Sequence, residues 1–394
     1  MHRSLFVLSG VNPLRGYGPV IYLADALVAA GIDVELFAPV PRRMMKEFEG
    51  HRFRVHSYFM DWYGSIPRLR LYLFGLYLLY RGSRERPAIL CSDIHFFREA
   101  VFLRRRFPEI PLIHFCEELF LPEEKKLFPM IRHISFYERN ANAPDLVVDV
   151  EPHRAAIRKA RYGLTSDVVV LQNTIPRSEM PIPDRSGSLS RLAGGSIPPD
   201  RPVLVYTGGV HSKESFLTII SALSELKPPV FFLGFCHGHA SHVRWLKELV
   251  QSRLGPERGR ICPAVQRNAL LSCLGEANAG LVYYPYSVHP TQNQLYCSPT
   301  KAMEYLACGL PVVGSANPSL IGLLEAQGRG VCTRDDSAAA LRDAIITVLN
   351  MSRTEPSLGE RLRKDFRDNL CFEVQSTKAM GRILEILKEA RPIG

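Results

Sequence analysis

The sequence predicts two doubly wound α/β domains, each with a parallel sheet between layers of helices. In both halves, short apolar segments of strand length alternate with helical segments. A stretch rich in Pro, Gly and Ser, from about 172 to 201, separates the two series. The chain has 394 residues, of which 46% are hydrophobic and 22% charged. At roughly 100 to 200 residues per domain, this length accommodates two domains with a core each.

The first series begins with an apolar strand at residues 4–8 and a turn-rich segment, SGVNPLRGYG. A helix follows, with Pro19 at its start and Gly31 at its stop, and IDVELFAP then alternates as a strand. These elements form a βαβ unit of a parallel sheet. The alternation resumes with AILCSDI, the helical HFFREAVFLRRRF, PLIHF and, after another helix, DLVVDV. We therefore expect a first domain at residues 1–171.

The second series opens with VLVYTGG and a helix over about 214–226. It continues as VFFLGF, a helix through HVRWLKELV, RICPAV, a helix through LLSCL, and AGLVYYP. We expect a linker at 172–201 and a second domain at 202–373. A last helical segment, 374–394, could pack back on the first domain.

Charge and cysteine content narrow the class of partner and the compartment. The formal net charge of +10 favours anionic partners such as nucleotides, phospholipid surfaces or nucleic acid. The nine cysteines are odd in number and never spaced as CxxC, which indicates neither a disulfide framework nor a zinc ribbon. The segment MHRSLFVLSGVNP has too short an apolar run for a signal peptide. We expect a cytoplasmic protein with reduced thiols.

The densest motif is QNQLYCSPTKAMEYLACGLPVVGS, residues 292–315. Ser298 and Pro299 mark a helix start, with the serine hydroxyl as N-cap and the proline at the first helical position. Gly309 is the matching stop. The unpaired N–H groups at the start of such a helix suit a phosphate or diphosphate.

Two charged residues of this helix fit a nucleotide. Lys301 lies in the first turn, where a cation opposes the helix dipole unless an anion is bound. Glu304 lies one turn further on the same face and would accept hydrogen bonds from two ribose hydroxyls. The alternative is a well-capped core helix with a Lys301/Glu304 surface pair.

This motif, placed after a strand that ends in YYP, resembles the donor-binding segment of family-4 glycosyltransferases of GT-B fold. The resemblance extends to SGVNPLRGYGPVIYLADAL, VLVYTGGVHSKESFLTIISAL and RICPAVQRNALLSCLGEANAGLVYYP. It implies two Rossmann-like domains that face each other across a cleft, with the acceptor site in the first and the donor site in the second. It also implies transfer of a sugar from a nucleotide diphosphate sugar, UDP- or GDP-linked, with retention and without a metal ion or cofactor. The acceptor would be a glycan, a lipid-linked molecule or a small molecule.

The resemblance also assigns roles to individual residues. The helix start, with Ser298, Pro299, Thr300 and Lys301, would face the diphosphate, and Glu304 the ribose. Lys213 would be a cation near the phosphates, beside Gly209, and the backbone near Val265 would contact the base.

Two positions depart from the family pattern. Many members have a first glutamate, which contacts the donor sugar, eight positions before the second, and this chain has Tyr296 there. Many also have an arginine where this chain has Gly209, so Lys213 would hold the phosphates with fewer cations or with His211.

In the first half, Gly10, Gly16 and Gly18 surround Arg15 at a strand-to-helix turn, where glycine permits close approach of a ligand. The spacing is not GxGxxG, which disfavours a nicotinamide site. Together with the second-half motif, we expect this loop, through Arg15, Gly16 and Gly18, to face the donor phosphates. The alternative is a turn without a ligand.

His114 follows PLI and is expected at the carboxyl edge of the sheet, where ligands of open α/β sheets bind. The resemblance places a histidine that contacts donor and acceptor there, with Glu117 or Glu118 toward the acceptor. The alternative is a buried histidine whose ring nitrogens are both satisfied.

Three further clusters lie outside these motifs. His237, His239 and His242 have a spacing open to a metal, but no carboxylate or thiolate pair accompanies them, so we expect no metal site. The apolar run Leu71–Tyr80 is too short to span a bilayer; with the arginines that flank it within 68–86 it could lie on an anionic membrane, or pack as a core helix. Arg104, Arg105 and Arg106 add basic charge without any nucleic-acid-binding signature, so we expect no nucleic-acid partner.

The activity expected is therefore that of a hexosyl- or N-acetylhexosaminyl-type glycosyltransferase, with His114, Lys213 and Glu304 as its catalytic group. The alternatives are a nucleotide-sugar epimerase or a phosphorylase of the same fold, and a non-catalytic protein that binds nucleotide sugars or a membrane surface.

Overall fold

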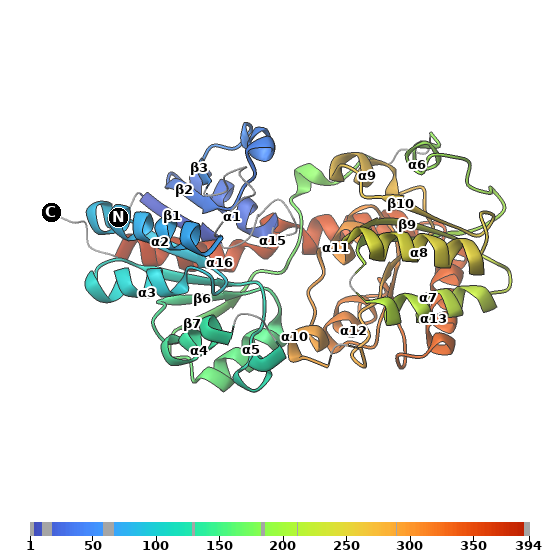
Figure 1. The fold of residues 1–394 in the computed structure, drawn as a ribbon. Helices are drawn as coiled ribbons and strands as arrows, with labels where there is room; N and C mark the ends of the chain where they lie inside the picture. Colours follow the sequence, from blue (N-terminus) through green and yellow to red (C-terminus); the bar gives the residue numbers. More distant parts are fainter. Residues whose placement is uncertain are drawn as a thin grey trace. The chain divides into compact units, whose positions relative to one another are not determined.

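The structure is a computed structural model that describes residues 4–9, 18–57, 67–127, 131–182, 186–210, 212–288 and 290–389. The chain forms two compact units (Figure 1). The first comprises residues 1–173 and 372–394, and the second residues 174–371.

The first unit contains a seven-stranded, entirely parallel sheet in the order β3-β2-β1-β4-β5-β6-β7. Its strands are β1 (Ser4–Ser9), β2 (Asp33–Ala38), β3 (Arg54–Ser57), β4 (Ala88–Ser92), β5 (Leu112–Cys116), β6 (Leu146–Asp149) and β7 (Asp167–Val170). The helices are α1 (Gly18–Ala29), α2 (Pro67–Glu85), α3 (Phe97–Arg106), α4 (Ile131–Asn140) and α5 (Pro152–Tyr162), with short turns at η2 (Arg42–Phe48) and η3 (Pro122–Leu127). The central strands are almost wholly apolar because helices cover both faces of the sheet.

Residues from the far end of the chain complete the first unit. After α15 (Phe372–Gln375), helix α16 (Thr377–Glu389) packs on β6 and β7, and Figure 1 shows it in red among the blue and green elements. Its side chains Ala379, Ile383 and Leu387 are fully buried in the core formed by β1, β2 and α1. Arg382 of α16 forms an ion pair of 2.6 Å with Asp167 of β7, the edge strand of the sheet. The first unit is therefore built from two separate stretches of sequence.

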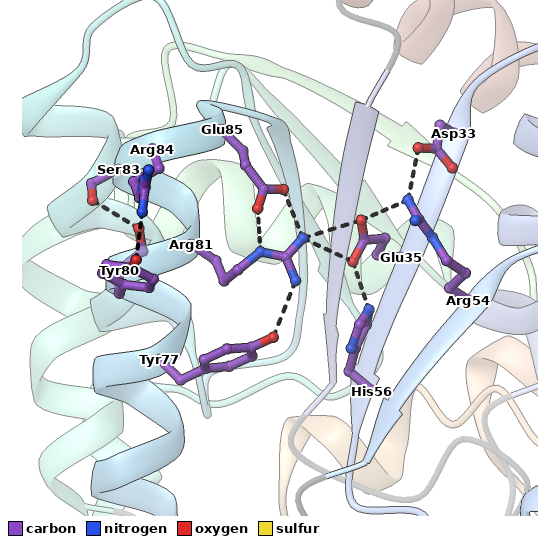
Figure 2. A network of polar contacts seen from close by, with 10 residues as sticks. All are labelled: Asp33, Glu35, Arg54, His56, Tyr77, Tyr80, Arg81, Ser83, Arg84 and Glu85. Atoms are coloured by element: carbon purple, nitrogen blue, oxygen red, sulfur yellow. Dashed lines mark hydrogen bonds and ion pairs between the residues drawn. The ribbon is translucent and has the colours of Figure 1, made fainter.

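A buried carboxylate on β2 joins three elements of the first unit (Figure 2). Glu35 is 3% exposed and has Arg81 of α2 on one side and Arg54 and His56 of β3 on the other. The distances from its oxygens are 2.8 Å to Arg54 Nη2, 2.6 Å to His56 Nε2 and 3.2 Å to Arg81 Nη2. Arg81 is also held by Glu85, one turn further along α2. These ion pairs fix α2 against the edge of the sheet.

A second buried ion pair lies at the carboxyl end of β6. Arg158 of α5 and Asp149 are 1% and 0% exposed at their side chains, and Arg158 Nε donates to Asp149 Oδ2 at 2.8 Å. The same guanidinium donates through Nη2 to the carbonyl of Glu118 at 2.8 Å. A buried charge of this kind is tolerated because an opposite charge and a further hydrogen bond compensate for its desolvation.

The second unit contains a six-stranded parallel sheet in the order β10-β9-β8-β11-β12-β13. Its strands are β8 (Val203–Gly209), β9 (Phe231–His237), β10 (Gly259–Pro263), β11 (Ala279–Val282), β12 (Val312–Gly314) and β13 (Gly330–Cys332). The helices are α6 (Ser188–Leu192), α7 (Lys213–Glu225), α8 (Ala240–Arg253), α9 (Arg267–Leu274), α10 (Gln292–Leu295), α11 (Thr300–Ala307), α12 (Pro318–Leu324), α13 (Ala338–Thr354) and α14 (Leu358–Asp365), with turns at η4 (Arg177–Glu179) and η5 (Phe366–Leu370).

Most of the segment expected as a linker, 172–201, belongs to the second unit. It contains α6, whose Leu189 is buried and whose first backbone N–H groups donate to the carboxylate of Glu276 at 2.7 Å and 3.2 Å. Glu276 caps α6 from a distant part of the sequence, so the Pro/Gly/Ser composition gave no sign of this docking.

Two further observations concern the cysteines and the hydropathy of the helices. The nine cysteines are all buried and form no disulfide. Within the described ranges, no helix combines the length and the hydropathy needed to cross a bilayer.

Candidate functional site

Helix α11, which carries the densest sequence motif, starts one residue later than expected. Pro299 adopts an extended conformation, with ψ of 119°, and is itself the N-cap, so the first helical residue is Thr300 and Ser298 precedes the cap. The prediction of Ser298 as N-cap is therefore wrong. At the other end, Gly309 has φ of +80°, and Leu310 N donates to Tyr305 O at 2.9 Å, which is a Schellman stop.

The rotation of α11 about its axis is fixed by Tyr305. Its hydroxyl accepts from Thr207 N at 2.8 Å, and its ring covers Gly280 of β11 so closely that a Cβ there would lie 2.2 Å from the ring. Tyr305 is fully buried, and Lys301, one turn before it on the same side of α11, lies beside Tyr206 of β8.

Lys301 lies in an aromatic environment. Its ammonium is 4.3 Å from the ring centroid of Tyr206 and 5.0 Å from that of Tyr284. Burial acts to lower the pKa of Lys301, but Tyr206, Tyr284 and Tyr305 outweigh it and the pKa is raised above its ordinary value. Among the residues that the structure describes, Lys301 has no carboxylate partner, and the alternative Lys301/Glu304 surface pair does not form.

The end of β8, where the chain turns toward α7, lies directly beside this ammonium. Gly208 has φ of +133°, and a Cβ at that position would be 2.8 Å from Lys301 Nζ. Gly209 accepts a hydrogen bond of 2.8 Å from the Tyr206 hydroxyl through its carbonyl. A side chain at 208 would fill the space over the ammonium, so glycine keeps the backbone and the cation close together.

Lys213 is the first residue of α7, directly after the N-cap Ser212, whose hydroxyl accepts from Ser215 N at 3.1 Å. The Lys213 side chain is exposed, and its ammonium lies 5.3 Å from the Trp245 ring centroid. In the described part of the chain it makes no ion pair. His211, which the sequence left open as a helper, lies outside the described residues.

Glu304 has a cationic partner that the sequence did not indicate. Its Oε1 accepts from Arg267 Nε at 2.6 Å, and Arg267 Nη1 donates to Glu179 of η4. Arg267 is the first residue of α9 and follows Val265, which is half-buried in the loop after β10. Since Arg267 is far from Glu304 in sequence, only the packing of α9 beside α11 reveals the pair.

Tyr296, at the position of the missing glutamate, ends the short helix α10, where its N–H donates to Gln292 O at 3.0 Å. The loop around it is bonded to the segment after β12. Asn317 donates to Gln294 O and Ser319 to Cys297 O, both at 2.8 Å. The start of α11 is thus preceded by a fixed loop.

In the first unit, the expected glycine loop can be placed only in part. Gly10, Arg15 and Gly16 lie outside the described residues, and Gly18 is the first residue of α1.

His114 does not end its strand, contrary to the prediction. It is in the middle of β5, is 1% exposed, and packs between the rings of Phe97 and Tyr137. Its Nε2 is 2.9 Å from Asp93 O and its Nδ1 is 3.3 Å from Cys116 Sγ. Burial, reinforced by the charge of Arg158, lowers its pKa to about 3. This geometry favours the alternative of a satisfied, neutral core histidine.

Carboxyl groups gather instead at the carboxyl ends of β4 and β5. Asp93 has φ of +55°, and its Oδ1 accepts from the backbone N–H groups of Glu117 and Glu118 at 3.1 Å and 3.2 Å. Burial, together with the charge of Glu118, raises the pKa of Asp93 to about 7. Burial, together with Asp93, also raises the pKa of Glu117, whose Oε1 accepts from Ser92 at 2.8 Å.

Of the three histidines considered as metal ligands, His237 ends β9, and His239 and His242 lie at the start of α8. His239 Nδ1 is 2.7 Å from Ser241 Oγ, and His242 Nδ1 is 3.3 Å from Val210 O. Across the described ranges, no three His, Cys, Asp or Glu side chains are arranged to hold a metal ion.

The region 68–86 forms most of α2, and the side chains described there divide between two roles. Arg81 is part of the Glu35 network, so it is not a free cation for an anionic membrane, which is one of the two alternatives that the sequence left open. Leu76 and Tyr80 are exposed on α2, and Phe102 is exposed on the neighbouring α3.

The fold and the contents of the second unit define a class of protein. The chain has two Rossmann-like units with parallel sheets. The second presents a glycine turn, a glutamate and two lysines that have no carboxylate partner among the described residues. This combination is typical of nucleotide-dependent transferases. The comparisons with known proteins agree. The family model described as Glycosyltransferase Family 4 matches residues 20–179, and the one described as Glycosyl transferases group 1 matches residues 193–365. The chain belongs to the family-4 glycosyltransferases, and the resemblance in sequence is confirmed.

Solved structures show the same GT-B fold over the whole chain. A sucrose-phosphate synthase from Thermosynechococcus elongatus is 19% identical with a TM-score of 0.76, and covers 99% of this chain and 100% of its own. A glycosyltransferase from Rickettsia africae is 12% identical with a TM-score of 0.75, covering 98% and 99%. Anabaena HepE in complex with UDP and glucose is 13% identical with a TM-score of 0.71, covering 98% and 100%. No curated protein sequence matches the chain significantly.

Proposed function

We propose that this protein transfers a hexosyl or N-acetylhexosaminyl group from a UDP-linked sugar to an acceptor hydroxyl, with retention and without a metal ion. The observation that carries the proposal is Lys301. A partly buried ammonium that faces tyrosine rings and a glycine turn, with no carboxylate partner in the described residues, keeps a positive charge that can attract an anion. A diphosphate at the start of α11 is such an anion.

The chemistry follows from the charges around that position. When the bond between the sugar and the diphosphate breaks, negative charge develops on the leaving phosphate oxygen. The ammonium groups of Lys301 and Lys213 and the N–H groups at the start of α11 would stabilise this charge. These groups supply the positive charge that a metal ion provides in other transferases, so we expect activity to persist in a chelator.

UDP is the preferred nucleotide of the proposal because Anabaena HepE binds UDP and UDP-glucose in a structure of the same fold. The base would lie against the loop at Val265, and the ribose hydroxyls against Glu304. Gly209 would let the diphosphate approach the backbone after β8.

The test is calorimetric titration with UDP, GDP, ADP and dTDP. We expect UDP to bind, and Glu304→Ala to weaken binding by about 2 kcal/mol, since charge-assisted hydrogen bonds to the ribose are lost. Glu248→Ala, on the exposed face of α8, is the matched control and should bind as wild type does. An unchanged dissociation constant for Glu304→Ala would remove this residue from the site, and no binding of any nucleotide would end the proposal.

Turnover separates an enzyme from a binding protein. Release of UDP from UDP-sugars in the presence of acceptor hydroxyls is expected, with the anomeric configuration of the product retained. Binding of UDP without any release would favour the non-catalytic alternative, in which Tyr296 replaces the glutamate that holds the donor sugar. Conversion of the donor to another UDP-sugar would favour the epimerase.

We also propose that the outer surface of α2 and α3 contacts an anionic membrane. Tyr80 and Phe102 are 55% and 58% exposed, and arginines accompany them: Arg84 on α2, and Arg98 and Arg106 on α3. Aromatic side chains with arginine neighbours suit the headgroup region of anionic lipids. Wild type should sediment with vesicles containing phosphatidylserine, and a Tyr80→Ser/Phe102→Ser variant should not. Equal sedimentation of both would contradict this contact.

A further inference from the structure

We infer that Arg267 is a positioning residue for nucleotide recognition: it orients the Glu304 carboxylate toward the ribose and is itself held by Glu179. The inference rests on the proposed donor site and goes beyond it, because the family resemblance gave no role to Arg267 or Glu179.

Glu304 keeps the hydrogen-bonding capacity that a ribose needs. Arg267 Nε donates to Oε1 at 2.6 Å, and the Glu304 side chain is 14% exposed. A carboxylate has about four lone-pair positions, so one bond from arginine leaves enough of them to accept two ribose hydroxyls. Arg267 therefore holds the Glu304 side chain in one rotamer and leaves most of its acceptor positions for other hydrogen bonds.

Arg267 is held in turn by a second carboxylate. Its Nη1 donates to Glu179 Oε2, so the two sides of the guanidinium bind two different carboxylates. Arginine suits this role because its planar group presents donors in fixed directions, whereas lysine provides a single point charge. Neither carboxylate is exposed beyond 27%, so the pairs are less screened than at an open surface.

The position of Arg267 also joins two parts of the proposed site. It is the first residue of α9 and comes two residues after Val265, the loop assigned to the base. One side chain therefore connects the base loop with the ribose carboxylate. A nucleotide that binds both would find them already aligned, which reduces the ordering cost of binding.

Glu179 connects this arrangement to the beginning of the second unit. It lies in η4, within the segment that opens the unit at Thr174. The last residue of α11 has a similar connection, because Arg363 donates to Ala307 O at 3.2 Å and to Pro181 O at 2.6 Å. Segment 179–181 is therefore connected indirectly to the middle and to the end of α11, and Glu179 acts on the nucleotide through Arg267.

The test compares UDP with 2′,3′-dideoxy-UDP, which lacks both ribose hydroxyls. If Arg267 acts by orienting Glu304, Arg267→Ala should raise the dissociation constant for UDP about tenfold and leave that for the dideoxy compound unchanged. Arg267→Lys should recover part of the loss, and Glu179→Gln should weaken UDP binding about threefold. Arg342→Ala, an ion-paired arginine on α13, is the matched control and should bind both ligands as wild type does.

The outcomes separate the inference from the proposed function. An equal loss for both ligands in Arg267→Ala would mean a merely structural role and would overturn the inference. If Glu304→Ala discriminates between the ligands and Arg267→Ala does not, the donor site stands and the positioning role falls. If UDP does not bind to wild type, the donor site and the inference fail together.

Discussion

The two units share a fold but differ in the partners of their charged side chains. In the first unit, the buried charged groups Glu35, Asp149 and Arg158 are neutralised by partners of opposite sign within the unit. In the second, Lys213 and Lys301 face aromatic rings instead of carboxylates. Paired charges hold secondary-structure elements together, whereas cations that have no carboxylate partner can still bind an anion. This difference agrees with the donor site that we propose in the second unit.

The largest expected effect tests the structural side of this comparison. Arg158→Ala leaves Asp149 buried without a counter-ion and should lower the free energy of unfolding by about 4 kcal/mol. Urea unfolding measures this loss. The control is Arg161→Ala, which lies on the same helix as Arg158 and forms an exposed pair with Glu123. This variant should unfold as wild type does. Equal stability of the Arg158 variant would mean that the buried pair does not hold the first unit.

The next effect concerns pH. The pKa of Asp93 is about 7 in the folded chain, against an ordinary value of 3.8, so the folded state binds more protons between these limits. Its contribution to stability is therefore greatest at acidic pH and is lost as pH rises toward 7. Asp93→Asn should reduce the fall in stability between pH 5 and pH 8 by about 2 kcal/mol, measured by urea unfolding. The same fall in both proteins would show that Asp93 titrates normally.

Lys301→Met tests the functional side. Methionine fills a similar volume between Tyr206 and Tyr284 but carries no charge. We expect UDP binding to weaken by about 2 kcal/mol, the value of a charged hydrogen bond, and the melting temperature to fall only slightly, because the contacts of the ammonium with the tyrosine rings are lost. Calorimetry and thermal unfolding measure the two quantities. A fall in stability with unchanged binding would place Lys301 among the structural charges, and the contrast between the units would disappear.

The smallest effect is expected at Lys213. Because this side chain is exposed, salt screens its attraction for a diphosphate. Lys213→Met should weaken UDP binding about threefold at low ionic strength and hardly at all in 1 M salt. Titrations at the two ionic strengths check this, and a loss that is independent of salt would indicate a direct, desolvated contact instead.

Much of the fold could be predicted because its strands are buried on both faces. Such strands give continuous apolar runs, as at 203–209 and 231–237, and the helices between them keep a regular period. The α/β class was confirmed in this way. The docking of α6 was not predictable, because it depends on Glu276, which is distant in sequence.

The site was predictable only where one short segment carries it. Lys301 and Glu304 share a helix, so their spacing alone places them on one side. Arg267 and Glu179 reach Glu304 from other elements, and no local pattern marks them. His114 was misplaced because a histidine flanked by apolar residues looks like the end of a strand, although Asp93 O and Cys116 satisfy it within β5.

The return of α16 to the first unit affects the order in which the chain can fold during synthesis. The core around β1, β2 and α1 includes Ala379, Ile383 and Leu387, so it stays incomplete until the ribosome has made residue 387. Residues 174–371, by contrast, are all available before α16 exists. The unit that begins first in the sequence is thus the last to be completed, and its unfinished apolar surface remains open to chaperones while the second unit is already complete.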